Sequence, residues 1–384
     1  MKVLQILGFT SLAAGAAVPA AAPLRALYFF ENDPAGANIV SLKVSSKDGS
    51  LSDPVRTSTG GKGLIGVNNM GAQVAMDTLF SQDAVVVSGS HLFTVNPGAN
   101  TVSMFTIPKN DPWHPKLVGA PVPSGGDFPM SVAYSPKHRL ACVANSGAKN
   151  NVQCYEVTPA GLRPSGESMP LPLNQTTPPV GPANTVSDIL FNPSESALFV
   201  TVKGTGTGAG YIYAYPIGQS KVQPTPRVSR PAELGTNFGM SFLGSDSKAV
   251  VSDPGFGGAF VDIDCNLKAS VTKVVNVTGN AASCWTHYSA EFGAAYIMDA
   301  GVPNITVLDP KTMEVKPTLA GPAAAAGMFD GTVGAGHLYA LDAADSITVY
   351  SLKDSSVAQT FNLTGFGNRQ FFQGMAFYGG GWKL

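Results

Sequence analysis

Seven polar residues stand directly after short apolar runs, and their types make them the first candidates for chemistry. They are Glu31, Asn96, Asn145, Lys203, Asp253, Asp299 and Asp342. Hard cations prefer carboxylate and amide oxygens, so the successive aspartates Asp253, Asp299 and Asp342 are weak candidates for a metal site. Asp and Asn are also common where a strand ends, because their side chains bond the local backbone in turns. We therefore interpret the set mainly as turn formers, and expect neither a metal nor another cofactor.

The runs that position these residues recur seven times along the chain. They begin at Leu27, Leu92, Leu140, Leu198, Val250, Tyr296 and Leu338, at intervals of 42 to 65 residues. Each is followed, after a small turn, by a second strand-like run, which is typical of radial repetition of a four-stranded unit. The sequence therefore predicts an all-β, seven-bladed β-propeller with four antiparallel strands in each blade.

A further strand precedes most of these runs and is expected to line the central channel. Such inner strands are predicted near Met130, Asp188, Gly239 and Cys284. The first run has no such predecessor, whereas an apolar stretch at residues 374–379 follows the seventh blade. We therefore expect the C-terminal strand to complete the first blade and close the ring. Loss of the last dozen residues should then be severely destabilising.

In such a ring the inner strands begin and the second strands end on one face, which we call the mouth of the channel. An enzyme acting there would use Asp188, Lys203 and Arg230, the groups expected near the funnel. Four of the five histidines are predicted in turns or loops, where solvated roles are typical: His91, His114, His138 and His337. His287 falls within an inner strand, where we expect a buried, hydrogen-bonded structural role.

The composition suits one turn-rich domain without a charged binding surface. Only 13% of the 384 residues are charged, the formal net charge is −1, and Gly and Pro number 43 and 29. Without a basic block, nothing neutralises phosphates as nucleic-acid binding requires. A propeller grows by adding blades, so we expect residues 21–384 to form a single domain. We also expect a monomer.

The N-terminus has the pattern of a secretory signal peptide. Lys2 precedes an apolar run, and small residues around Ala17 and Ala20 suit cleavage, so residues 1–20 are assigned to the signal. The run is shorter than the roughly 20 residues of a membrane-spanning helix. Four glycosylation sequons agree with secretion, at Asn174, Asn276, Asn304 and Asn362. We expect an extracellular or cell-wall glycoprotein.

Four cysteines in an oxidising compartment are expected to form two disulfides. Cys142 and Cys154 flank a turn centred near Ala148 at equal distance, which places them opposite each other on adjacent antiparallel strands. That pairing leaves Cys265 for Cys284. Each bridge is expected to stabilise the fold by about 2–4 kcal/mol.

The repeats, with inner strands ending in motifs such as AYSP and LFNP, resemble the seven-bladed lactonase family. Within it, the chain is similar to the secreted fungal proteins named for 3-carboxymuconate cyclase. The resemblance covers essentially the whole mature chain. It implies a cofactor-free enzyme that opens or forms lactones, with His, Arg and Glu around the funnel.

The residues that the resemblance would place in these roles are replaced in this sequence. Met130 stands at the position of the family His, Ser187 at that of the family Arg, and Lys203 at that of the family Glu. Proton transfer needs a positioned group of suitable pKa, and neither Met130 nor Ser187 supplies one. The inherited mechanism is therefore expected to be absent.

These observations favour an extracellular binding or surface-interaction protein. Its partner would be a small uncharged or weakly polar ligand, or a component of the extracellular matrix or cell wall. The alternative is an active lactonase or 3-carboxymuconate cyclase-like enzyme with a rebuilt site, or a metal-assisted hydrolase that uses Asp253, Asp299 and Asp342. Fold alone does not decide between them.

Overall fold

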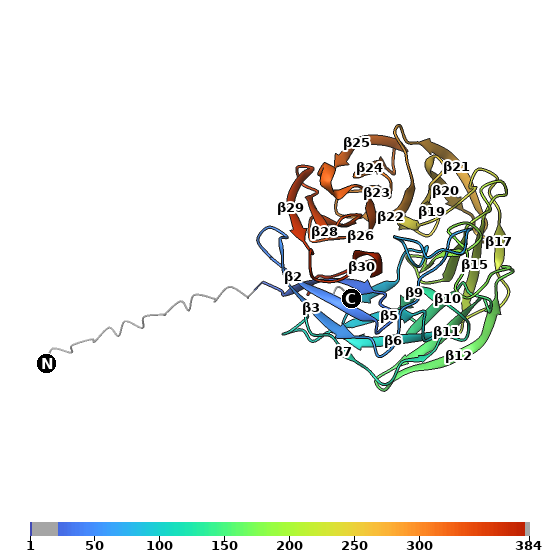
Figure 1. Cartoon of the computed structure of the whole chain (residues 1–384), viewed down its shortest axis with the longest axis horizontal. Coiled ribbons are helices and arrows are strands. Elements are labelled where there is room, and N and C mark those ends of the chain that lie inside the picture. The colour runs from blue at the N-terminus through green and yellow to red at the C-terminus, as the bar shows by residue number, and fades with distance from the viewer. Residues whose placement is uncertain (2–21, 381–384) are drawn as a thin grey trace.

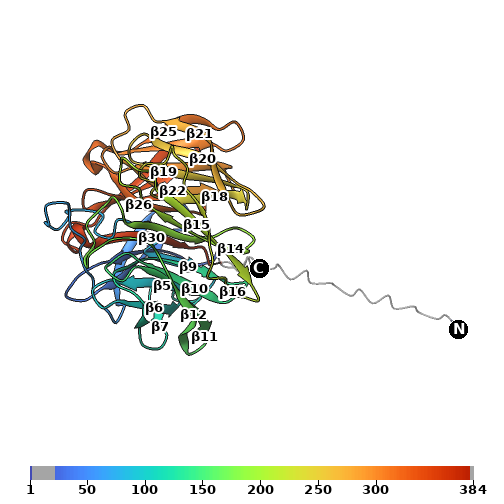
Figure 2. The same ribbon diagram turned by 90° about the vertical axis from the view of Figure 1, so that its right-hand side faces the viewer.

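The computed structural model describes residue 1 and residues 22–380. Apart from Met1, the predicted signal peptide at residues 1–20 lies outside the described residues. The described chain forms a ring of seven four- or five-stranded antiparallel sheets around a central axis (Figure 1; Figure 2 shows the ring turned by 90°). The seven-bladed propeller predicted from the repeats is confirmed.

Each sheet runs from an inner strand at the axis to an outer strand at the rim. The first two blades contain β30 (Phe372–Tyr378), β1 (Arg25–Glu31), β2 (Asn38–Val44) and β3 (Leu51–Ser58), then β4 (Val85–Ser88), β5 (His91–Asn96), β6 (Thr101–Thr106), β7 (Lys116–Leu117) and β8 (Val122–Pro123). The third and fourth contain β9 (Pro129–Ser135), β10 (Leu140–Asn145), β11 (Asn151–Thr158) and β12 (Gly161–Pro170), then β13 (Val186–Phe191), β14 (Ala197–Val202), β15 (Tyr211–Gly218), β16 (Lys221–Val222) and β17 (Arg227–Ser229).

The remaining three blades have four strands each. They contain β18 (Met240–Ser245), β19 (Lys248–Asp253), β20 (Gly257–Ile263) and β21 (Ala269–Asn276), then β22 (Ser283–Ser289), β23 (Ala294–Asp299), β24 (Asn304–Asp309) and β25 (Glu314–Ala320), then β26 (Met328–Gly334), β27 (His337–Asp342), β28 (Ser346–Ser351) and β29 (Ser356–Asn362). The helical elements of the described residues are two three-residue 3₁₀ turns, η1 (Ala323–Ala325) and η2 (Arg369–Phe371).

The burial of the strands follows their distance from the axis. Every residue of β10 is buried because the sheet packs between two neighbouring blades, so both faces need apolar or small side chains. The rim strand β25 is exposed at every position except Leu319. The core therefore lies between the sheets, and most charged residues lie at the rim and in the loops, although Asp188 and Asp330 are buried in the inner strands β13 and β26.

The ring is closed by strands from the two ends of the chain. β30 pairs with β1 in antiparallel register, with Ala26 opposite Tyr378 and Glu31 opposite Phe372. The Phe29 and Phe372 rings lie 4.9 Å apart across this pair. The predicted completion of the first blade by the C-terminal strand is confirmed.

One of the two predicted disulfides forms. Cys142 and Cys154 lie opposite each other on β10 and β11 and are bonded. The predicted bond between Cys265 and Cys284 is wrong. Cys265 is exposed in the turn after β20, whereas Cys284 is buried in the inner strand β22. Elimination among four cysteines does not indicate whether a residue lies near the axis or at the rim.

Thiol labelling will report this arrangement. In the native protein without reductant, one equivalent of a maleimide should react quickly, at Cys265. A second equivalent should react only after denaturation, because the Cys284 thiol is buried, and four should react after reduction. A denatured, unreduced protein without any free thiol would contradict the structure.

The four sequon asparagines are all exposed. Asn174 lies in the loop after β12, and Asn276, Asn304 and Asn362 lie at the ends of rim or third strands. Glycans at these positions would not disturb the sheets. Among the described residues, no helix is long and apolar enough to cross a membrane.

Candidate functional site

The seven residues at the ends of the second strands are buried, and most of them bond residues of their own blade or of the loop that leads into it. Lys203 also bonds the Phe80 carbonyl, which belongs to the connection between β3 and β4. The Glu31 carboxylate pairs with Arg56 at 2.7 Å, and the Asn145 amide donates to the Asn151 side chain and the Ser124 carbonyl. Asn96 bonds Thr101 and Ser103 in the same way. This is the turn-forming role that the residue types favoured.

The three aspartates proposed as weak metal ligands accept hydrogen bonds from nearby groups, which are backbone amides for Asp253 and Asp299 and side-chain hydroxyls for Asp342. Asp253 accepts from the amides of Thr236 and Gly255, and Asp299 accepts from those of Ala281, Ala282 and Gly301. Asp342 accepts from the hydroxyls of Ser346 and Thr348. In the part of the chain that the structure describes, no three His, Cys, Asp or Glu side chains are grouped as metal ligands.

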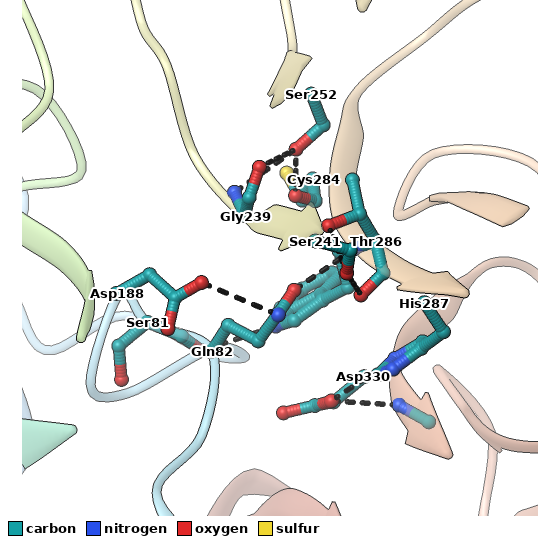
Figure 3. A network of polar contacts seen from close by, with 12 residues as sticks. Ser81, Gln82, Asp188, Gly239, Ser241, Ser252, Cys284, Thr286, His287 and Asp330 are labelled. Atoms are coloured by element: carbon teal, nitrogen blue, oxygen red, sulfur yellow. Dashed lines mark hydrogen bonds and ion pairs between the residues drawn. The ribbon is translucent and has the colours of Figure 1, made fainter. Parts of the chain in front are cut away.

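The mouth half of the channel is filled by the chain itself. The connection between β3 and β4 runs over the mouth and then descends the axis as residues 78–83, which we call the axial segment. Thr78, Leu79, Phe80, Ser81 and Gln82 are all at most 3% exposed. In Figure 3, the pale-blue loop that carries Ser81 and Gln82 passes between inner strands of other blades.

The backbone of the axial segment is bonded to blades on opposite sides of the ring. On one side, Val132 of β9 donates to the Asp83 carbonyl at 2.9 Å, and the Gln82 amide donates to the Ser187 carbonyl of β13 at 2.8 Å. On the other, the Trp285 indole of β22 donates to the Ser81 carbonyl at 3.0 Å. The segment therefore holds the third, fourth and sixth blades together.

The Gln82 side chain is the hub of this network. Its Nε2 donates to Asp188 Oδ2 at 3.3 Å, and its Oε1 accepts from the Thr286 amide at 2.8 Å (Figure 3). Asp188 Oδ2 also accepts from the Met240 amide at 3.0 Å. Gln82 thus links β13 and β22 directly across the axis, and β18 joins the network through Asp188.

The cations at the mouth face a carboxylate of the same connection. Lys203 donates to the carbonyls of Phe80 and Val186 at 2.6 and 3.0 Å. Burial lowers the pKa of Lys203 to about 7, against the opposing effect of Asp77. Burial raises the pKa of Asp77 to about 7, opposed by Lys203 and Arg369. Asp77 therefore supplies a negative charge close to both cations.

Glycines allow the covering loops to lie directly on the axial segment. A Cβ at Gly66 would come within 2.3 Å of the Phe80 ring, and one at Gly181 within 2.5 Å. These two loops also bridge each other at Val67 and Val180. The mouth is thus covered by two adjacent loops that both lie against the Phe80 ring.

The residues predicted for catalysis are only partly brought together. Asp188 and Lys203 both contact the axial segment, but Arg230 is exposed near the rim, where it bonds the Ala209 carbonyl and stacks over Tyr211. Met130 is buried in the core, and its carbonyl accepts from Ser81. Ser187 bonds Thr201 and the Asn237 carbonyl. None of these last three has a free polar side-chain group at the axis.

The other half of the channel is a cavity of about 340 Å³. It opens on the face opposite the mouth. Its walls come from the second halves of β13, β22 and β26 and the first half of β18: Leu190, Phe191, Pro193, Met240, Ser241, Phe242, Tyr288, Thr332 and Val333. Gln82, Asp83 and His287 complete the lining. The axial segment therefore forms the floor of this cavity.

The expectation of a hydrogen-bonded structural role for His287 is wrong. Its Nε2 is buried without a hydrogen-bond partner and lies 3.8 Å from Asp330 Oδ1 (Figure 3). Burial lowers the pKa of His287 to about 4. The ring is therefore neutral at ordinary pH and lines the cavity beside a buried acid. His114 lies in a loop and His138 in a turn, as predicted, whereas His91 and His337 are the first residues of the strands β5 and β27.

Three carboxyl groups lie close together at the lower end of the axial segment: Asp83 of the segment itself, and Asp188 and Asp330 of the inner strands. Burial raises the pKa of Asp83 to about 7, although a hydrogen bond with Asp188 opposes the shift. Burial, and then the nearby Asp83, hold the pKa of Asp188 and of Asp330 well above its usual value. Buried acids without a cationic partner keep their protons, so this cluster is mainly neutral below pH 7.

The comparisons with known proteins agree with this architecture. No protein-family model matches the sequence, and none of the curated proteins is similar to it in sequence. The chain folds like lactonase-type propellers. A proposed 6-phosphogluconolactonase from Bacteroides uniformis superposes with a TM-score of 0.66 at 13% identity, over 93% of this chain and 99% of that one. Another from Bacteroides fragilis gives 0.63 at 11% identity, over 94% and 100%.

The same architecture also occurs in a structure of a protein–protein complex. A chain from the crystal structure of a nidogen/laminin complex gives a TM-score of 0.50 at 12% identity, over 92% of this chain and 98% of that one. At such identities the likeness shows the fold alone. The seven-bladed, lactonase-like scaffold is therefore established, and its function has to be argued from the site.

Proposed function

We propose that the chain is a secreted, glycosylated binding protein on a lactonase-like propeller, in which the mouth of the channel no longer catalyses. The observation that carries the proposal is the axial segment, whose buried residues fill the mouth half of the channel. A small substrate needs a concave, accessible site, and here the chain's own backbone occupies that space.

The electrostatics of the mouth support the same reading. A phosphorylated or carboxylated lactone needs cations to hold its anion. The two buried cations here, Lys203 and Arg369, are bonded to backbone carbonyls and face Asp77. With Met130 and Ser187 at the positions of the family His and Arg, the mouth also lacks an acid–base pair.

We propose that recognition occurs on the outer surface of the disc. The partner is then a component of the extracellular matrix or cell wall, with the exposed loops as the contact surface. Membership of the fungal 3-carboxymuconate cyclase-like group belongs to this proposal as well, since it rests on the repeat motifs. The scaffold is the same in proposed lactonases and in a protein–protein complex, and it accommodates either role.

The proposal is tested with a panel of lactones, assayed at pH 5–8 with and without calcium. We expect no ring opening above that of buffer, and no difference between the wild type and Lys203→Ala. Lys221→Ala, which changes an exposed lysine, is the matched control. Turnover that is abolished in Lys203→Ala would overturn the proposal in favour of a rebuilt lactonase. Calcium-dependent turnover lost in Asp299→Ala would favour the metal-assisted enzyme.

A further inference from the structure

The cavity opposite the mouth combines acidic groups with an apolar, aromatic wall. Asp83 and His287 lie at its floor, while Phe191, Phe242 and Tyr288 are on its walls. In the described part of the chain, none of the residues that line it is Lys or Arg. The buried cations lie on the far side of the axial segment. Lys203 bonds the Phe80 carbonyl, and Arg369 bonds the carbonyl of Asp342 at the end of a second strand.

Several polar atoms around this cavity have no partner. His287 Nε2, on the cavity wall, makes no hydrogen bond. Asp188 Oδ1 and Asp330 Oδ2 are also unpaired, and both of these residues are buried behind the lining. Buried polar atoms are almost always hydrogen-bonded, so unpaired atoms gathered in one place indicate a missing partner. Asp330 also has a left-handed backbone, with φ of 71°, which is uncommon for a residue other than glycine.

From these observations we infer that the cavity binds a small organic ammonium ion with an apolar or aromatic body. The ammonium group would lie against Asp83 on the floor, next to His287, with Asp330 behind the His287 ring. The apolar body would pack against Phe191, Phe242 and Tyr288, whose ring faces attract cations. A volume of about 340 Å³ is at the lower end of known ligand sites and suits a molecule of this size.

The charge of the cluster explains why a cation is preferred. Several carboxyl groups share one buried region, so each ionised group disfavours ionisation of the next. A bound cation supplies the counter-charge that the described protein groups do not supply at the cavity. An anionic ligand would meet repulsion from Asp83 and from Asp188 behind it, and a neutral ligand would gain only the apolar contacts.

Binding should therefore be linked to loss of a proton. Asp83 faces Asp188 from β13, Asp330 from β26 and His287 from β22, while Asp77 and Lys203 lie above it at the mouth. His287 stays neutral across pH 5–8. As the pH rises through about 7, ionisation of Asp83 becomes easier, so affinity for an ammonium ion should rise.

The test is calorimetric titration of the full-length protein with benzylamine, benzyl alcohol and benzoate at pH 8 and pH 5.5. We expect benzylamine to bind one to one at pH 8, at least about tenfold more tightly than either analogue, and at least about tenfold more weakly at pH 5.5. Asp83→Asn should reduce the affinity at pH 8 by about tenfold or more. Asp264→Asn, which neutralises an exposed acid, is the control and should have no effect.

A second variant guards against misfolding of Asp83→Asn. Thr332→Lys places an ammonium group on the cavity wall and should abolish benzylamine binding while leaving the melting temperature nearly unchanged. Equal affinity for benzylamine and benzyl alcohol would overturn the inference. So would binding that persists in Thr332→Lys. The inference does not depend on the proposed function, because a protein with lactonase activity at the mouth would still bind the amine at the opposite end.

Discussion

A chain that ends at Phe371 should not form a stable monomer. Deletion of β30 removes the inner strand of the first blade and exposes the paired edge of β1. Four apolar side chains of β30 are at most 7% exposed: Phe372, Met375, Ala376 and Tyr378. Burial of large side chains contributes about 1.5–3 kcal/mol each, and the backbone bonds to β1 are lost as well. Their sum is comparable to the whole stability of a domain, about 5–15 kcal/mol.

Circular dichroism and a thermal melt measure this outcome. The truncated chain should show no cooperative transition and should aggregate through the open edge of β1. A circular permutant is the matched control, in which residues 372–380 are joined by a short linker ahead of residue 24. It should melt cooperatively, because Ala26 and Tyr378 are already opposite each other. A truncated chain as stable as the permutant would show that β30 does not close the ring.

Gln82→Ala should cost about 3 kcal/mol of unfolding free energy. The change leaves the Thr286 amide without a partner and removes one of the two hydrogen bonds to Asp188 Oδ2, which keeps the bond from the Met240 amide. A buried group deprived of its partner costs about 1–3 kcal/mol, and the lost bond to Asp188 adds about 1 kcal/mol. Urea unfolding measures this difference in free energy, provided that the slope of the unfolding free energy against urea concentration is the same for both proteins.

Gln223→Ala is the control for this prediction. Gln223 is exposed, and its side chain bonds only the nearby carbonyls of Gly218 and Lys221. Its replacement should change stability by less than about 0.5 kcal/mol, as is usual for surface positions. If Gln82→Ala changed the free energy of unfolding as little as the control does, the axial segment would not hold the blades together. The claim that this segment stably fills the mouth would then be contradicted.

The parts of the fold that were predictable depend on local patterns. Alternating apolar runs at similar intervals marked the blades, and the missing predecessor of Leu27 pointed to the C-terminal strand as its partner. The bond between Cys142 and Cys154 followed from symmetry about one turn. In each case the signal lay within one hairpin or one repeat, where register is set by neighbouring residues.

The axial segment could not be predicted in the same way. Its contacts join Gln82 to residues that are more than a hundred positions away in sequence, such as Asp188 and Thr286. One signal was present, because the interval from Leu27 to Leu92 is the longest of the six, at 65 residues. The extra length lies in the connection that crosses the mouth. Interval length indicates an insertion, but it does not show where the insertion lies.

Radial position was the other quantity that the sequence did not contain. Arg230 and Lys203 are close in sequence, yet one lies near the rim and the other at the axis. Asp83 and Asp330 were missed because neither ends a strand nor belongs to a recognisable motif. Their importance comes from burial beside Asp188 and His287, which only the assembled ring creates.

The closure of the ring also determines which face of the disc is turned toward a solid support when the protein is immobilised through one end of its chain. Since β1 begins where β30 ends, both described ends of the chain leave the disc on the face that carries the cavity. A solid support coupled near either end would press against that face and hinder small molecules from entering. Coupling through Lys149, an exposed residue in a turn on the mouth face, instead orients the cavity toward bulk solvent.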